Sequence, residues 1–311
     1  MATAATTPAT LDFPNGDAAR QLAPLNALTI DVEDYYHVSG FEHIVARAEW
    51  DRYESRVVAS TQRVLYVLER AEVRATFFVL GWVAQRHPHL VRSIRAAGHE
   101  VGCHSYEHRL IYTQSPDDFR DDLRRAREVL QDVLSEPVTA YRAPSFSITQ
   151  QSEWALDILV EEGFTTDSSI YPTHHDRYGL PGTPLQPHEI RRMGGSLWEF
   201  PPPVWRILGY PLPVGGGGYF RLYPYALTRR GLGEINRAGR PFAVYLHPWE
   251  FDLAQPRLRP GWLRGFRHYV NLHRTEPRLV RLLGDFSFGT LSEALARWRG
   301  ESTRARPSRA A

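Results

Sequence analysis

Apolar and polar residues alternate along this chain in two periods, which predicts strands and helices in turn. Nearly continuous apolar runs, as in residues 25–32, 73–80 and 241–246, are typical of buried parallel strands. Between them, apolar residues recur at helical spacing, as in residues 56–71 and 119–133. Because strands and helices alternate throughout, the pattern predicts a parallel sheet covered by helices, either as a barrel or as an open sheet.

Weaker signals extend this order of elements toward the C-terminus. Further strands are predicted at residues 99–103, 138–142, 164–167 and 197–200, and further helices at residues 150–162, 225–238 and 291–298. A stretch rich in His, Pro and Gly, residues 173–196, is predicted to be a long loop. Loops of that length in a compact domain are usually functional or mobile.

Two histidines, His104 and His108, stand four residues apart just after the strand predicted at residues 99–103. If the chain turns into a helix at Ser105, both imidazoles project from one face and can reach one divalent metal ion. Such a site also needs an oxygen ligand and an open position for water. The alternative is a solvated pair on a loop, because thirteen histidines in the chain make this spacing common by chance.

Polar side chains follow several of the predicted strands at the point where each strand ends. Asp31 and Glu33 end the first strand and face the same way in an extended segment, so one could bind a metal while the other acts as a base. The histidine pair, Arg142 and His247 end three other strands. In a β/α barrel the carboxyl ends of the strands converge on one mouth, so these groups are predicted to meet there.

Composition narrows the class of protein. The 311 residues, 42% of them hydrophobic, suit one large α/β domain or two small ones. A net charge of +2, with the charges interspersed, gives no electrostatic case for binding nucleic acid. The single cysteine, Cys103, excludes an intramolecular disulfide and is interpreted as a small buried hydrophobe.

The sequence shows no recognisable signal for membrane insertion or export. No run approaches the length of a transmembrane helix, and residues 1–12 have the features of neither a signal peptide nor an anchor. We therefore expect a cytoplasmic protein, acting there or at the inner face of the membrane. The sequence leaves the oligomeric state open.

Five spaced motifs carry a family resemblance: Thr29-Ile-Asp-Val-Glu-Asp34, Ala75-Thr-Phe-Phe-Val79, His104-Ser-Tyr-Glu-His108, Arg142-Ala-Pro144 and Leu246-His-Pro248. With them the chain resembles the polysaccharide deacetylase family (the NodB homology domain, carbohydrate esterase family 4-like) over residues 25–296. It is similar in particular to peptidoglycan-deacetylase-like and allantoinase-like proteins, and its C-terminal part to exosortase-linked deacetylases of exopolysaccharide loci. The resemblance implies an α/β fold, a distorted (β/α) barrel of about seven strands with a C-terminal extension.

The resemblance also implies roles for the strand-end residues. Asp31 matches the catalytic base of the family, Arg142 the arginine that orients this base, and His247 the general acid. The base and the acid would lie on opposite sides of the carbon that is attacked, as amide hydrolysis requires.

The metal ligands implied by the resemblance are His104 and His108, and the cofactor is a divalent metal, with zinc as the expected ion. The adjacent Asp-Asp pair usual in the family is replaced here by Asp31-Val-Glu-Asp34. We therefore expect Glu33 to be the carboxylate ligand, with Asp34 as the alternative.

The implied substrate is a polysaccharide or lipid-linked glycan with N-acetylhexosamine units. Tyr35 and Trp249 are expected in the cleft because they adjoin site residues, and sugar rings stack on aromatic faces. Ser145 stands where the family has an aromatic residue after Arg-x-Pro, and a backbone N–H near it is a candidate oxyanion donor. Two other functions stay open: a cyclic amide or imide hydrolase, like the allantoinase-like relatives, and a non-catalytic glycan-binding module.

The predicted organisation has four parts. They are a disordered lead (residues 1–24), a catalytic domain (residues 25–250), an extension packed on the barrel (residues 251–298) and a tail (residues 299–311).

Overall fold

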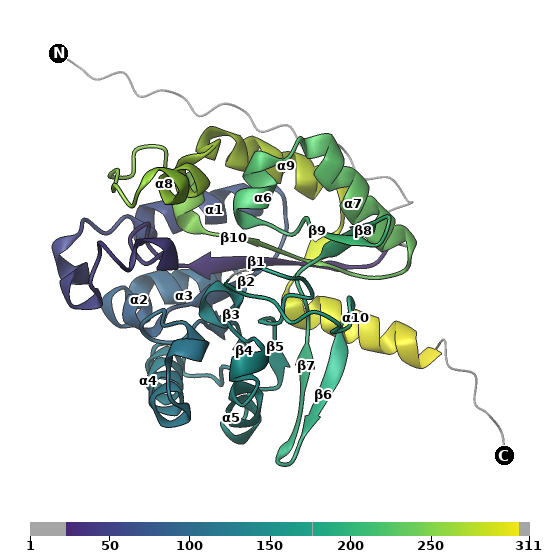
Figure 1. The fold of residues 1–311 in the computed structure, drawn as a ribbon, viewed down its shortest axis with the longest axis horizontal. Coiled ribbons are helices and arrows are strands. Elements are labelled where there is room, and N and C mark those ends of the chain that lie inside the picture. Colours follow the sequence, from purple (N-terminus) through teal and green to yellow (C-terminus); the bar gives the residue numbers. More distant parts are fainter. Residues whose placement is uncertain (1–22, 176, 305–311) are drawn as a thin grey trace.

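The computed structural model describes residues 23–175 and 177–304 (Figure 1). Residues 1–22 of the predicted lead and residues 305–311 of the predicted tail lie outside the described residues. Residues 299–304, also assigned to the tail, continue the last helix. The predicted division into domains stays a prediction.

The centre of the structure is a nine-stranded sheet in the order β10-β1-β2-β3-β4-β5-β7-β6, with β11 paired to β1. All pairings are parallel except that of β6 with β7. The strands are β1 (Asn26–Val32), β2 (Thr76–Val79), β3 (Glu100–Cys103), β4 (Ala140–Tyr141), β5 (Thr166–Asp167), β6 (His188–Arg192), β7 (Gly195–Glu199), β10 (Ala243–Leu246) and β11 (Phe288–Gly289). A separate two-stranded sheet pairs β8 (Val204–Ile207) with β9 (Tyr210–Pro213). The predicted α/β class with a parallel sheet is confirmed.

Helices flank this curved sheet, with α2 to α5 on one side of β1 and β10 and α6 to α9 on the other in Figure 1. They are α1 (Val57–Arg70), α2 (Gly81–Arg86), α3 (Pro88–Ala96), α4 (Pro116–Leu134), α5 (Ala155–Glu161), α6 (Gly217–Leu222), α7 (Tyr225–Arg237), α8 (Trp262–Tyr269), α9 (Thr275–Asp285) and α10 (Leu291–Arg304). Each helix in the described part of the chain is too short or too polar to cross a lipid bilayer.

Local signals explain where several helices begin. Ser115 caps α4: its hydroxyl accepts from the backbone N–H of Asp118, while the Asp118 carboxylate accepts from the backbone N–H of Ser115. Pro88 occupies the first turn of α3, where its missing N–H costs nothing, and Gly98 follows that helix with a φ of +83°. These helix boundaries can be predicted from the sequence because they depend on residues that are close together in the chain.

Several predicted elements differ from the structure in type or length, and two of these differences have a clear local reason. The loop predicted at residues 173–196 contains β6 and the start of β7, which pair as an antiparallel hairpin. The reason is that Glu189 and Arg191 point outward from an edge strand, so this strand has no continuous apolar run. The strand predicted at residues 73–80 is shortened to β2, because Leu80 already turns the chain into α2.

Side chains alternate between the two faces of the sheet, and on the inner face the start of the strands is closed by apolar residues. Leu28, Ile30 and Val32 of β1 belong to the main apolar core, whereas Ala27 belongs to a smaller cluster on the opposite face. This smaller cluster joins strand residues to α10; its members are Ala27, Phe78, Ala140, Phe200, Ala243, Leu291, Ala294 and Leu295. Helix α10 therefore closes the end of the sheet at which the strands begin, and leaves the end at which they finish for polar groups.

A close contact between strands β2 and β3 depends on Gly102. A Cβ added at Gly102 would lie 2.6 Å from Cδ1 of Phe78, whose ring also contacts the Arg142 guanidinium 4.4 Å from its centroid. We expect Gly102→Ala to lower the free energy of unfolding by about 1–3 kcal/mol, because the Phe78 ring must move in a packed interior. Urea unfolding followed by circular dichroism measures this change.

The matched control is Gly233→Ala on helix α7, where the new methyl group meets its nearest atom at 3.9 Å. This control should be neutral or stabilising by about 0.5–1 kcal/mol, because alanine is the better helix former. Equal unfolding free energies for wild type and Gly102→Ala would contradict the argument.

Candidate active site

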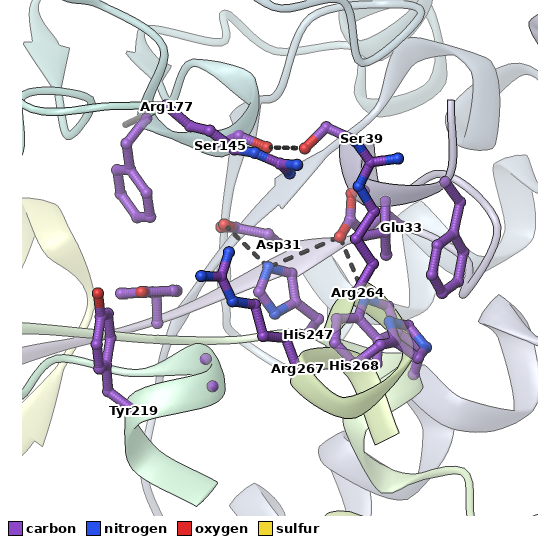
Figure 2. A pocket seen from close by; sticks show the side chains of 18 of the residues that line it. Asp31, Glu33, Ser39, Ser145, Arg177, Tyr219, His247, Arg264, Arg267 and His268 are labelled. Atoms are coloured by element: carbon purple, nitrogen blue, oxygen red, sulfur yellow. Dashed lines mark hydrogen bonds and ion pairs between the residues drawn. The ribbon is translucent and has the colours of Figure 1, made fainter. Parts of the chain in front are cut away.

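A cavity of about 450 Å³ opens at the end of the sheet where the strands finish. Its floor contains Asp31, Glu33, His104, His108 and His247, and Figure 2 shows several of these side chains facing one another. The structure therefore brings together polar residues that the sequence places at the ends of different strands. Two of them follow an inward strand residue by two positions, since His104 follows Gly102 and His247 follows Tyr245.

Glu33, His104 and His108 form a cluster in this cavity that could hold a metal ion, and it is the candidate metal-ligating cluster of the site. Their nearest ligand atoms all lie within 4.8 Å of one another, and all three side chains are buried. His108 Nε2 is 2.8 Å from Glu33 Oε2, yet this oxygen has no hydrogen-bond partner among the described residues. An unsatisfied buried carboxylate oxygen beside two imidazoles has the chemistry of a divalent metal site.

The state of His104 suits a metal ligand. Its Nδ1 lies 2.8 Å from the backbone oxygen of Arg142, which can only accept, so Nδ1 carries the proton and Nε2 has a free lone pair. Burial lowers the pKa of His104 to about 4, so the imidazole is neutral at pH 7. For Glu33, burial by itself raises the pKa, but electrostatic attraction to His108, and after it to His247, outweighs burial and holds the pKa well below its ordinary value.

The two histidines are not on a helix, contrary to the geometry considered from their spacing. Ser105 and His108 have φ values of +63° and +52°, so the segment between them is a tight loop. Asp122 of α4 holds this loop by accepting from the backbone N–H groups of Tyr106 (2.8 Å) and Glu107 (3.1 Å). The imidazoles therefore meet through a loop anchored on a neighbouring helix, with ring centroids 5.3 Å apart.

Arg142 and Asp31 form a buried ion pair beside the metal-ligating cluster. Nη1 of Arg142 donates to Asp31 Oδ1 (2.8 Å) and to the hydroxyl of Thr29 (2.6 Å). Its other nitrogens donate to the backbone oxygen and hydroxyl of Ser168. Because the guanidinium is fixed on three sides, it fixes one oxygen of Asp31 and leaves the other facing His247.

His247 faces the two carboxylates of the floor. Its Nε2 lies 3.9 Å from Asp31 Oδ2 and 3.7 Å from Glu33 Oε1, while Nδ1 lies 2.8 Å from Oε1 of Glu250. Burial alone lowers the pKa of His247, but the hydrogen bond to Glu250 and the surrounding carboxylate charges raise it to about 9. Protonated His247 can therefore donate a proton from Nε2 into the cavity.

Glu250 and Arg221 behind His247 were missed by sequence reasoning. Nε of Arg221 donates to Glu250 Oε2 (2.6 Å), and this guanidinium also donates to backbone oxygens of His268 and Val270. Burial raises the pKa of Glu250, but the Arg221 charge and His247 lower it below its usual value. The spacing of Glu250, three residues after His247, could have indicated a partner for the imidazole, whereas no local signal marks Arg221 as buried.

The structure separates the two carboxylates that were alternatives for metal binding. Asp34 accepts from the backbone N–H groups of Tyr35, Arg56 and Val57 and from the hydroxyl of Ser55. It therefore anchors the start of α1, where the helix dipole favours a negative charge. Its oxygens are occupied by these donors, and the metal-ligating cluster contains Glu33 instead.

The residues predicted to contact substrate occupy three different positions. Tyr35 is 1% exposed and lies in the core rather than in the cavity lining. Trp249 borders the cavity but is buried, and its Nε1 donates to Glu33 Oε1 (3.1 Å), so its position fits orientation of that carboxylate. Ser145 lines the mouth, where its hydroxyl lies 2.9 Å from that of Ser39 (Figure 2).

A pair of buried acids lies behind Arg142. Asp167 and Glu199 are opposite each other on β5 and β7, and both are fully buried. The Ser169 hydroxyl donates to Asp167 and accepts from the backbone N–H of Ala143, while Glu199 Oε1 accepts from the N–H of Ile170 (3.1 Å). The pair thus supports the segment that carries Arg142.

Two family models match this chain in succession. Residues 50–164 match the model described as polysaccharide deacetylase, and residues 168–296 match a domain of unknown function, DUF3473. Among curated relatives, the peptidoglycan-N-acetylmuramic acid deacetylase PdaA of Bacillus subtilis is 27% identical over 48% of this chain and 54% of its own length. The chain spans about a third to a half of the length of the first curated relatives it matches.

Solved structures share the fold over nearly the whole chain. The crystal structure of a proposed polysaccharide deacetylase from Mycobacterium smegmatis has a TM-score of 0.60 at 21% identity, covering 96% of this chain and 99% of that one. Puue allantoinase has a TM-score of 0.57 at 13% identity, covering 89% and 90%. These likenesses confirm the predicted distorted barrel, and they concern the fold alone.

The acid pair of Asp167 and Glu199 makes stability depend on pH. Burial raises the pKa of Asp167 to about 6 and that of Glu199 well above its ordinary value. Because both pKa values are higher in the folded state, the stability that the protonated pair contributes is complete below about pH 4 and is lost as the pH rises through 6. Glu199→Gln cannot ionise at this position, so it should gain about 1–3 kcal/mol relative to wild type between pH 4 and pH 7.

Urea unfolding at each pH measures this difference, with the exposed Glu153→Gln as the control that should track wild type. A constant difference between Glu199→Gln and wild type across this range would show that the pair does not bind extra protons in the folded state.

Proposed function

The chain belongs to the polysaccharide deacetylase family through the domain that residues 50–164 match, and from this premise we propose that it is a metal-dependent N-deacetylase. The reaction is hydrolysis of the acetamide on an N-acetylhexosamine unit of a glycan. The observation that carries this proposal is the placement of Asp31 and His247 beside the metal-ligating cluster, with Nε2 and Oδ2 3.9 Å apart.

Glu33, His104 and His108 would hold the divalent ion, for which we propose zinc because two imidazoles and a carboxylate are a common zinc ligand set. When bound, the ion supplies a Lewis acid that polarises the amide carbonyl and lowers the pKa of water. The protein contributes the orientation of its ligands: Arg142 fixes His104 through its backbone oxygen, and Trp249 fixes Glu33.

Asp31 is the proposed base that removes a proton from the attacking water. The buried Arg142 keeps this carboxylate ionised and aims its free oxygen into the cavity. His247 is the proposed acid, since its raised pKa keeps it protonated at neutral pH and Glu250 fixes its Nδ1 side. Transfer of this proton to the amine nitrogen lets the C–N bond break.

We propose that the substrate is a bacterial exopolysaccharide or its lipid-linked precursor. The relatives support the reaction class, because PdaA is named for removal of an N-acetyl group from a glycan sugar. Location in the cell remains a prediction from sequence.

The alternatives have weaker support. An allantoinase, which is a cyclic amide hydrolase, shares this fold. Here, however, the cavity extends outward along α6, α8 and the segment before β6, so it offers more contact surface than a single small ring would use. A binding module would have no need for the carboxylate and the imidazole, Asp31 and His247, placed to move protons.

Metal binding tests the ligand assignment. We expect His104→Ala to bind zinc at least about 100-fold more weakly than wild type, since loss of a ligand exceeds the usual cost of losing a supporting group. Competition with a chromophoric chelator measures the affinity, and the exposed His89→Ala is the matched control. Unchanged affinity in His104→Ala would remove this residue from the site.

Turnover tests the base. Asp31→Asn keeps the shape of the side chain but removes the acceptor of the proton, so kcat should fall roughly 10²- to 10⁴-fold while zinc affinity changes little. Acetate release from N-acetylglucosamine oligomers gives kcat, and the same chelator competition gives the affinity. A variant with wild-type kcat would refute the assignment of Asp31.

A further inference from the structure

Arginines surround the mouth of the cavity above the acidic floor. Arg264 and Arg267 come from α8, and Arg177 comes from the segment before β6; all three line the cavity. Figure 2 shows their side chains reaching over the cavity from different directions, with Arg264 beside Ser39 and Arg177 beside Ser145.

The two arginines of α8 are exposed and are not neutralised by acids. Within the described residues, neither Arg264 nor Arg267 forms an ion pair with a carboxylate, and Arg264 instead donates to His43 Nδ1 (2.8 Å). Elsewhere arginines are commonly paired, as Arg56 is with Asp252 and Arg63 with Glu276. Among the described residues, therefore, no carboxylate offsets the positive charge that Arg264 and Arg267 bring to the mouth.

The acids of the floor do not neutralise this rim either. Asp31 is engaged by Arg142 and faces His247, and Glu33 lies against His108. Guanidinium groups gathered at the rim of a cleft concentrate positive potential there and attract anions, with a geometry that suits carboxylate and phosphate.

Apolar side chains share the rim with the arginines. Phe266 is 52% exposed and Leu222 is 47% exposed, and both line the cavity. Tyr219 lines the same wall (Figure 2). Exposed aromatic and aliphatic faces beside guanidinium groups suit a chain of sugar rings that carries negative charge, since the rings need a flat apolar surface and the charge needs donors.

We propose that the cleft selects an anionic glycan, with a carboxylate or phosphate group next to the N-acetylated sugar, and that Arg264 and Arg267, with Arg177, hold this group. The inference rests on the proposed deacetylase function for the sugar at the floor. What it adds is that the sugar next to the N-acetylated one carries a negative charge.

Binding separates this inference from catalysis. Isothermal titration of the full chain would compare a hyaluronan hexasaccharide, in which glucuronate alternates with N-acetylglucosamine, with neutral chitohexaose and with UDP-N-acetylglucosamine. We expect wild type to bind an anionic probe about tenfold more tightly than chitohexaose, with the gap shrinking at about 0.5 M salt. Preference for hyaluronan over the nucleotide sugar identifies a carboxylate, and the reverse identifies a phosphate.

The variant is the double substitution Arg264→Gln and Arg267→Gln, with Arg259→Gln, an exposed residue outside the cavity lining, as the control. Exposed ion pairs are individually weak, so the double variant should bind the preferred anionic probe about 5- to 20-fold more weakly and chitohexaose less than twofold more weakly. The control should match wild type.

Equal binding of anionic and neutral probes, or equal losses for both in the double variant, would overturn the inference. So would an effect of the double variant confined to phosphatidylglycerol vesicles, which would assign these arginines to a lipid surface. Acetate release from chitohexaose without anion preference would leave the deacetylase standing while this inference fails. Anion preference without acetate release from any probe would support anion binding at the mouth while the deacetylase proposal fails.

Discussion

The buried guanidinium of Arg142 is the interaction on which this site depends. It is fully buried, and its donors reach Asp31 and Thr29 of β1 and Ser168 after β5. The backbone oxygen of Arg142 also fixes the tautomer of His104. An unpaired guanidinium in this position would be very costly, and the Asp31 carboxylate offsets part of that cost, together with the oxygens of Thr29 and Ser168. The contacts that compensate the burial of the Arg142 charge therefore also set the geometry of the proposed base, Asp31, and of one proposed metal ligand, His104.

The strand register distributes chemistry between the two ends of the sheet. Inward positions near the start of the strands are small or apolar and belong to the cluster that includes α10, whereas inward positions at or beyond the ends of the strands carry Asp31, His104, Arg142 and His247. A one-residue shift in register would turn all of these toward the helices. Behind His247, Glu250 and Arg221 repeat the arrangement seen behind Asp31, with a buried charge pair fixing a group that faces the cavity.

Much of the fold and the meeting of the strand-end residues could be predicted from the sequence, because apolar runs and helix caps are local signals. The loop that joins His104 to His108 could not, since its left-handed residues are held by Asp122 of a later helix. The hairpin of β6 and β7 was missed because β6 is an edge strand whose outward residues are polar. Burial of Trp249 and Tyr35, and the partnership of Arg221 with Glu250, depend on tertiary packing that adjacent residues do not reveal.

The most direct test of a metal-dependent deacetylase is acetate release from N-acetylglucosamine oligomers before chelation, after chelation and after zinc is added back. The account predicts that chelation abolishes release and that stoichiometric zinc restores it, because the ion that Glu33, His104 and His108 would hold is the proposed activator of the amide. Release that persists at the same rate in the chelated protein, with metal removal verified by elemental analysis, would contradict it.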